Sequence, residues 1–327
     1  MERKYLFEAG LNVYTSFKTL IPVEQLQNLE SVDTRKYHLY SILACPQMFF
    51  RKEKTYTDST GVHICIFASN NGIETEYVLP EWEIHKDLDY NKVNLTTAYP
   101  YISLEIEISD NNFLKSHPEF VNHCLTLYAH NLFISCSEQI VSKQEFEVLY
   151  IGQSYGKRGE RTAITRLSSH STLQKILMDC QSKYSGRHIY LLLLEITSLL
   201  NMSFDGLSKK YTKTIDESDI HMMNVLQNLP EEQQIVNISV AALIHYFKPE
   251  YNRNFVENFP NENHKGYRQY FNLDYNHFSF EIDLEFDACA PIQLYSPTNR
   301  INSSFDVVQY KLYNDQNRLT MYEMFKH

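Results

Sequence analysis

The residues VLYIGQSYGKRGERTAITRLSSHSTLQKIL, from Val148 to Leu177, decide the fold of the segment around them. The first four are apolar and are closed by Gly152, which predicts a buried strand that ends at a turn. The polar and basic residues 155–161 predict a loop, and a helical pattern begins at Thr162. The stretch therefore predicts a strand, a basic loop and a helix in close succession.

Arg166 and His170 give this stretch its chemistry. They are four residues apart, so a helix through both would place them on one face, within reach of a common ligand. A guanidinium offers a fixed fork of donors for phosphate oxygens, and a histidine can carry a proton near neutral pH. This pair indicates a site that handles phosphate esters.

A second stretch, VAALIHYFKPEYN, runs from Val240 to Asn252. Its apolar positions continue a helical stripe: Val236, Val240, Leu243, Ile244 and Phe247. The helix is expected to end before Pro249, because a proline disfavours helical geometry in the residue ahead of it. On spacing alone, Val240 is a core residue of this helix.

Taken together, the two stretches resemble the core of the GIY-YIG nuclease superfamily over about residues 130–255. The resemblance lies in an ordered set: Tyr150-Ile151-Gly152, then Arg166 and His170, then the ALI helix and its KPEYN ending. It implies that Tyr150 positions or deprotonates the attacking water, Arg166 stabilises charge, His170 transfers a proton and Asn252 holds the geometry. It also implies Mg²⁺ or Mn²⁺ as cofactor.

The chain departs from that pattern at two places. Val240 stands where the family's metal-binding glutamate is expected, and valine has no oxygen to offer a hard cation. The expected partner strand upstream has no clear counterpart; the best candidate is 132–134, where Phe133 lacks the tyrosine hydroxyl. Spacing does not select a replacement carboxylate from four candidates: Glu195, Asp219, Glu231 and Glu232.

Charge is distributed unevenly along the chain. The whole sequence has 30 Lys and Arg against 40 Asp and Glu, a net −10, which opposes general nucleic-acid binding. Residues 1–147 carry a net −8, with 12 basic and 20 acidic side chains, whereas residues 151–215 carry +6, with 10 and 4. This excess is either a solvated helix face or, as the motif favours, a phosphate-binding face. The predicted contacts to nucleic acid, with DNA preferred over RNA, are Lys157, Arg158, Arg161, Lys209 and Lys210.

The periodicities predict an α+β protein with three parts. Residues 1–129 form a strand-rich domain, with alternation over 102–109; residues 130–259 form the nuclease-like α/β sandwich, with a doubly buried strand at 188–196; residues 260–327 form a β-rich extension of hairpin and helix. The extension begins with alternating residues 278–286, one face of which is acidic. Such acidic flanks suggest a protein partner more than DNA.

The apolar runs, the cysteines and the histidines of the sequence bear on cellular location and on metal binding. No apolar run approaches the roughly 20 residues that span a bilayer, and the first residues lack a signal-peptide pattern, so a cytoplasmic location without membrane contact is the default expectation. The six cysteines form no C-x-x-C pair. His123, Cys124 and His130 lie close together but without paired ligands at zinc-site spacing, so no metal site is predicted there.

These observations predict a metal-dependent endonuclease that is weakened or inactive through the loss of the glutamate. One alternative is a nuclease-derived protein that binds nucleic acid without cleaving it. Another is an interaction subunit of a larger assembly, such as a host-defence complex. A carboxylate beside Tyr150 and Arg166 would favour the enzyme.

Overall fold

The computed structural model describes the chain over residues 2–32, 35–70, 72–120, 124–154, 166–167, 169–182, 186–204, 206, 208, 210–287 and 289–323. Helices and strands both contribute substantially, so the predicted α+β class is confirmed. No helix in these ranges has the length and apolar character needed to cross a bilayer.

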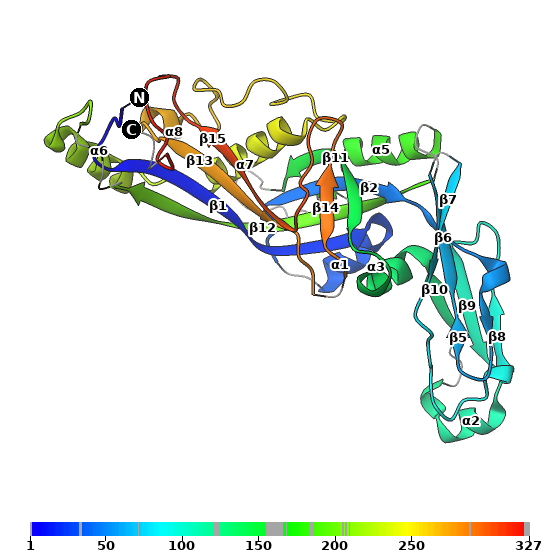
Figure 1. Cartoon of the computed structure of the whole chain (residues 1–327). Helices are drawn as coiled ribbons and strands as arrows, with labels where there is room; N and C mark the ends of the chain where they lie inside the picture. The colour runs from blue at the N-terminus through cyan, green and yellow to red at the C-terminus, as the bar shows by residue number, and fades with distance from the viewer. Residues whose placement is uncertain are drawn as a thin grey trace.

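A seven-stranded mixed sheet forms the body of the molecule (Figure 1). Its order across the sheet is β14 (Ile292–Tyr295), β11 (Gln144–Gln153), β2 (Leu39–Pro46), β12 (Arg187–Ser203), β1 (Glu8–Pro22), β13 (His277–Asp283) and β15 (Phe305–Lys311). The β11–β14 and β1–β13 pairs are parallel, and the other pairs are antiparallel. The seven strands of this one sheet thus come from segments that are widely separated in sequence.

Strand β12 lies at the middle of the sheet, and its first half is buried on both faces. Tyr190, Leu192 and Leu194 belong to one hydrophobic cluster, and the alternate residues Leu191 and Leu193 belong to another. Successive side chains of a strand point to opposite faces, so a nearly continuous apolar run supplies both cores. The predicted doubly buried strand at 188–196 is confirmed, and it continues to Ser203.

Helices cover the two faces of this sheet. Helix α7 (Glu232–Phe247) contributes its apolar stripe to the first cluster, and α5 (Ser171–Ser182) contributes Leu173 and Ile176 to the second. Helix α7 ends where Lys248 adopts a left-handed conformation with φ of 47°, directly before Pro249. Further helical elements of the body within the described ranges are η1 (Val23–Gln25), α1 (Leu26–Val32), α6 (Ile215–Gln227) and α8 (Gln269–Asn272).

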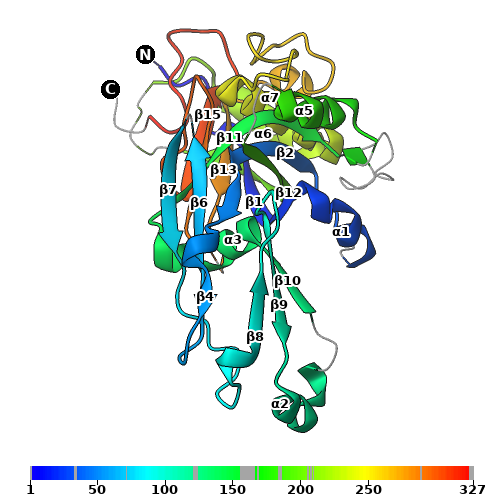
Figure 2. The same cartoon turned by 90° about the vertical axis from the view of Figure 1, so that its right-hand side faces the viewer.

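A separate lobe is inserted between β2 and β11 and extends away from the large sheet (Figures 1 and 2). It has its own hydrophobic cluster, which includes Phe50, Ile66, Leu104 and Phe113. Its strands are β3 (Met48–Phe50), β4 (Tyr56–Thr57), β5 (Val62–His63), β6 (Cys65–Asn70), β7 (Ile73–Val78), β8 (Val93–Thr96), β9 (Ser103–Ile108) and β10 (Cys124–Tyr128). Its helical elements are η2 (Lys52–Lys54), η3 (Tyr90–Lys92), α2 (Asn111–Ser116), η4 (Pro118–Phe120) and α3 (Ala129–Ile140).

The predicted boundaries at residues 129 and 259 do not separate independent sheets. Strands β1 and β2 come from the first predicted part, β11 and β12 from the second, and β13, β14 and β15 from the third, yet all seven form one sheet. The reason is physical: strand periodicity is local, whereas strand pairing depends on contacts between distant segments. The compact inserted unit is the lobe between β2 and β11.

The C-terminal segment is tied to the first strand through a buried ion group. Arg318 contacts the carboxylate of Glu8 and lies 2.6 Å from that of Asp274, and its side chain is only 2% exposed. The acidic face of β13 is partly occupied as well, because Lys18 lies 2.6 Å from Asp283 and the amide of Asn12 donates to Glu281. These contacts from β1 integrate the predicted C-terminal extension into the body.

Candidate functional site

Strand β11 carries the Tyr150-Ile151-Gly152 motif into the sheet beside β2. Gly152 pairs with Tyr40 across these antiparallel strands. A Cβ atom at residue 152 would lie 2.5 Å from the hydroxyl oxygen of Tyr40 and 2.9 Å from the ring of Tyr150. Glycine is required here because two tyrosine rings close over the backbone.

Tyr40 is the partner that sequence reasoning missed. The candidate partner strand at 132–134 was wrong, because these residues lie in helix α3 of the lobe. The antiparallel partner of β11 is β2, whose Tyr40 supplies the hydroxyl that Phe133 lacks. A signal was present, since residues 39–45 form an apolar run, but the lobe of about 100 residues separates it from Tyr150.

Tyr40, Tyr150 and His170 form a compact ring cluster. The Tyr40 hydroxyl lies 3.2 Å from Nε2 of His170, and the ring centroids of Tyr150 and His170 are 5.2 Å apart. Burial, together with the neighbouring Tyr150, raises the pKa of Tyr40 despite the opposing effect of Arg166. Tyr40 is therefore a neutral phenol at physiological pH.

His170 is held at the start of α5. The prediction that one helix carries Arg166 and His170 was wrong, because His170 is non-helical and directly precedes Ser171, the first residue of α5. Its Nδ1 accepts from the backbone N–H of Leu173, as a capping side chain does. Burial and the charge of Arg166 lower the pKa of His170, so the ring is neutral at pH 7 and Nε2 carries the hydrogen that it donates to Tyr40.

Asn252 fixes the motif strand from the other side. Its Oδ1 accepts from the N–H of Ile151 and its Nδ2 donates to the carbonyl of Ile151, both at 2.9 Å. The neighbouring Tyr251 donates from its backbone N–H to Leu149 and from its hydroxyl to Asp179 of α5. The KPEYN segment thus clamps β11 and α5 together.

Asn252→Ala is expected to lower the free energy of unfolding by about 2–4 kcal/mol, since it removes two hydrogen bonds and leaves both polar groups of Ile151 without that partner. Asn252→Asp retains the acceptor but turns an oxygen toward the carbonyl, so it is expected to be destabilising too. Urea unfolding measures both variants. Asn254→Ala, at an exposed neighbouring position, is the control; equal effects at 252 and 254 would contradict the clamp.

An open pocket of about 590 Å³ lies between β11, α5, α7 and the KPEYN segment. Of the four residues that the resemblance implies, Tyr150, Arg166 and Asn252 line it together. His170 is not among the described residues that line the pocket; its ring packs against that of Tyr150. Lys175 and Arg253, which sequence reasoning did not select, add two further cations. The sequence contained a signal for each of them. Lys175 lies in the helical pattern that follows the motif, and Arg253 is next to Asn252.

Val240 lies on the wall of the same pocket, where the resemblance places the glutamate. It is 6% exposed and contributes no oxygen. Glu195, Asp219, Glu231 and Glu232 are not among the described residues that line the pocket; the carboxylates that line it are those of Asp179 and Glu250. Asp179 accepts from the hydroxyl of Tyr251. With Val240 at the position of the glutamate, the described lining residues lack the ligand that the resemblance implies for Mg²⁺ or Mn²⁺.

Comparison with known proteins does not place the chain in a family. No family model, no curated protein and no solved structure matches it. A function for this chain therefore has to be argued from the chemistry of the pocket residues themselves.

Of the predicted basic contacts, only Lys210 is among the residues that the structure describes. Lys157, Arg158, Arg161 and Lys209 lie outside the described residues. Lys210 is exposed and is not one of the described residues that line the pocket. The cations that the structure does bring together are those of Arg166, Lys175 and Arg253.

Proposed function

We propose that the chain binds the phosphodiester backbone of nucleic acid in this pocket and acts on it as a weakened nuclease. The observation that carries the proposal is the convergence of Tyr150 and Arg166 with Lys175 and Arg253 on one open pocket of an otherwise acidic protein. Guanidinium and ammonium groups neutralise phosphates, and a clustered set of them can bind a backbone despite a negative net charge.

The neighbouring hydroxyls suit phosphate chemistry. Tyr40 and Tyr150 are within one ring cluster, and His170 donates to the oxygen of Tyr40. Tyr40 is fully buried and is not among the described residues that line the pocket, so its hydroxyl would act through Tyr150, which does line it. In this proposal His170 orients Tyr40, and Arg166 neutralises the charge that develops on the phosphorus-bound oxygens.

A second function is binding without cleavage, and Val240 favours it. A divalent ion normally supplies much of the charge stabilisation in phosphodiester hydrolysis. The apolar wall at Val240 removes the ligand that the resemblance implies for such an ion. The binding surface would remain intact, because Arg166, Lys175 and Arg253 do not depend on that ligand. DNA is the expected partner in both cases.

Salt dependence tests the binding surface that both functions share. In the double variant Lys175→Ala/Arg253→Ala, the slope of log affinity against log salt is expected to flatten by roughly 1–2, since each lost phosphate contact accounts for about 0.9 on duplex DNA. Lys86→Ala/Lys115→Ala, at exposed positions of the lobe, removes the same charge and should leave the slope unchanged. Binding to duplex DNA, single-stranded DNA and RNA is measured for all three proteins. Identical slopes for both double variants would remove the basis for the proposal.

A further inference from the structure

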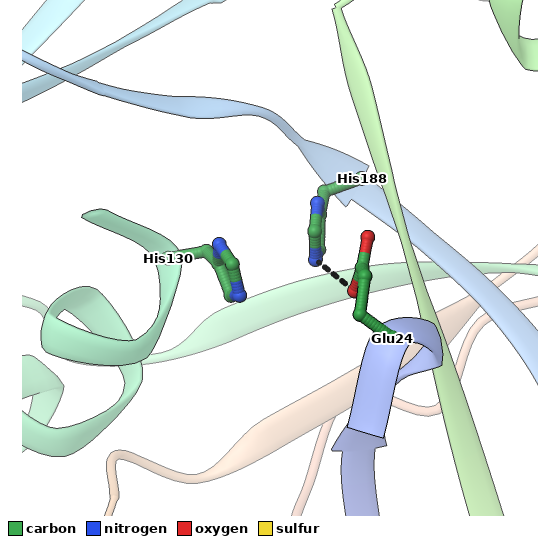
Figure 3. A group of neighbouring side chains, drawn as sticks. All are labelled: Glu24, His130 and His188. Atoms are coloured by element: carbon green, nitrogen blue, oxygen red, sulfur yellow. Dashed lines mark ion pairs between the residues drawn. The ribbon is translucent and has the colours of Figure 1, made fainter. Parts of the chain in front are cut away.

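A second polar cluster lies at the junction between the lobe and the large sheet. It consists of Glu24, His130 and His188, whose potential ligand atoms all lie within 4.8 Å of one another (Figure 3). Glu24 belongs to η1 after β1, His130 is the second residue of α3, and His188 is the second residue of β12. Three segments that are distant in sequence thus converge, which explains why no ligand spacing could be recognised around His130.

The hydrogen bonding of His188 determines which of its nitrogens faces Glu24. Its Nδ1 lies 3.0 Å from Oε1 of Gln47, and an amide oxygen only accepts, so Nδ1 carries a hydrogen. The other nitrogen, Nε2, lies 3.5 Å from a carboxylate oxygen of Glu24 and has no hydrogen-bond partner among the described residues. In the neutral ring, two lone pairs therefore face each other, and a cation or a second proton is needed between them.

His130 completes the cluster from the lobe side. Its ring is stacked on that of His188, with centroids 4.1 Å apart (Figure 3). His130 and His188 are 9% and 6% exposed, and Nδ1 of His130 is a further buried nitrogen without a hydrogen-bond partner in the described chain.

The surroundings leave room for an exchangeable ligand. The cluster borders a pocket of about 360 Å³ that also includes Gln25, Asn28 and Tyr128. This pocket shares no lining residue with the one at Tyr150. The carboxylate side chain of Glu24 is 62% exposed, so an ion can enter from the solvent side.

From this geometry we infer that Glu24, His130 and His188 bind one divalent transition-metal ion, of which Zn²⁺ is the best match. Two imidazole nitrogens and one carboxylate oxygen form a donor set suited to Zn²⁺ or Fe²⁺, whereas Mg²⁺ prefers oxygen ligands. Gln47 holds the ring of His188 through Nδ1, as second-layer partners of metal-binding histidines do. A bound ion would join the lobe, through α3, to both η1 and β12.

The test uses the full chain, stripped with chelator and dialysed, then titrated calorimetrically with Zn²⁺, Fe²⁺ under anaerobic conditions, or Mg²⁺. We expect one Zn²⁺ per chain, a higher melting temperature with Zn²⁺ and no comparable effect of Mg²⁺. Glu24→Gln keeps the shape of an exposed side chain and should weaken Zn²⁺ binding at least tenfold. Gln47→Leu should weaken it by roughly 10–100-fold through loss of the hydrogen bond to Nδ1.

A second group in the lobe, formed by His85, Asp87 and His117, provides the matched control. His85→Gln should leave the stoichiometry and affinity unchanged. Elemental analysis measures the metal content of the native chain and of Glu24→Gln, and the absorption spectrum of the Co²⁺-loaded proteins reports how the ion is coordinated. Absence of Zn²⁺ uptake, or uptake that His85→Gln abolishes and Glu24→Gln does not change, would overturn the assignment and leave a protonated His188 paired with Glu24.

Discussion

Val240→Glu is expected to raise manganese-dependent cleavage of nucleic acid by roughly 100-fold over the native chain, the scale of one well-placed electrostatic contribution to a transition state. The reason is the position of residue 240 on the pocket wall that also carries Tyr150 and Arg166. A carboxylate there would join Asp179 and Glu250 as an oxygen donor. Nicking of plasmid and cleavage of single-stranded substrates, each with Mn²⁺, Mg²⁺ or chelator, measure the change.

The same substitution is expected to lower the free energy of unfolding by about 2–5 kcal/mol without metal. Residue 240 is 6% exposed and packs in the apolar cluster under α7, so burial would raise the pKa of the new carboxyl above that of the unfolded chain. A raised folded-state pKa means that the cost is small below about pH 4 and grows as the pH rises. Mn²⁺ should restore stability to the variant more than to the native chain.

Val240→Gln distinguishes the effect of the glutamate's charge from the effect of its size. It has nearly the same size as the glutamate variant but is a poorer ligand, so it should be inactive and should not be stabilised by Mn²⁺. Equal cleavage by the glutamate and glutamine variants would contradict the role of position 240. Strong metal-dependent cleavage by the native chain would show instead that Asp179, Glu250 or another carboxylate already supplies the ligand.

Local patterns in the sequence predicted part of the candidate site. The motif strand, the ALI helix and the segment ending at Asn252 were predictable because periodicity and proline both act over short distances. They place Tyr150, Arg166 and Asn252 at one pocket. The function of that pocket remains a prediction, whereas its geometry follows from these elements.

Tyr40 was missed for a topological reason. Its strand pairs with β11 although the whole lobe lies between them in sequence, and no local pattern encodes which strands pair across such an insertion. Residue 170 shows a different limit: the i, i+4 spacing from Arg166 suggested one helix, but His170 caps α5 from outside it. Spacing alone does not distinguish a residue inside a helix from one that caps its first turn.

Sequence spacing also fails for the second polar cluster, which lies at the junction between the lobe and the large sheet. Glu24, His130 and His188 come from η1, α3 and β12, so their proximity depends on how the lobe returns to the sheet. Sequence spacing identifies metal ligands when two of them share a turn or a helix face. Here each ligand comes from its own element, so no spacing within a single segment could reveal the cluster.

Arg166→Ala is expected to reduce phosphodiester cleavage by roughly 10²–10³-fold, measured in the native chain if it cleaves and otherwise in the Val240→Glu background. Arg166 lines the pocket, and its charge acts on both Tyr40 and His170, so its loss removes a phosphate contact and changes the ring cluster together. Affinity for DNA should also fall, with a flatter salt dependence.

Arg166→Lys distinguishes the shape of the guanidinium from its charge. Lysine restores a point charge, so most of the salt dependence of binding should return. It cannot provide the planar fork that fits two phosphate oxygens. Arg166→Lys should therefore regain less than about a tenth of the cleavage activity that Arg166→Ala loses. The pH profile adds a check: because the charge of Arg166 lowers the pKa of His170, the alanine variant should protonate His170 at a higher pH than the native chain does. Nuclear magnetic resonance of the histidine ring measures this shift directly. An unchanged His170 titration, combined with unchanged cleavage and binding in Arg166→Ala, would place the phosphate elsewhere on the protein.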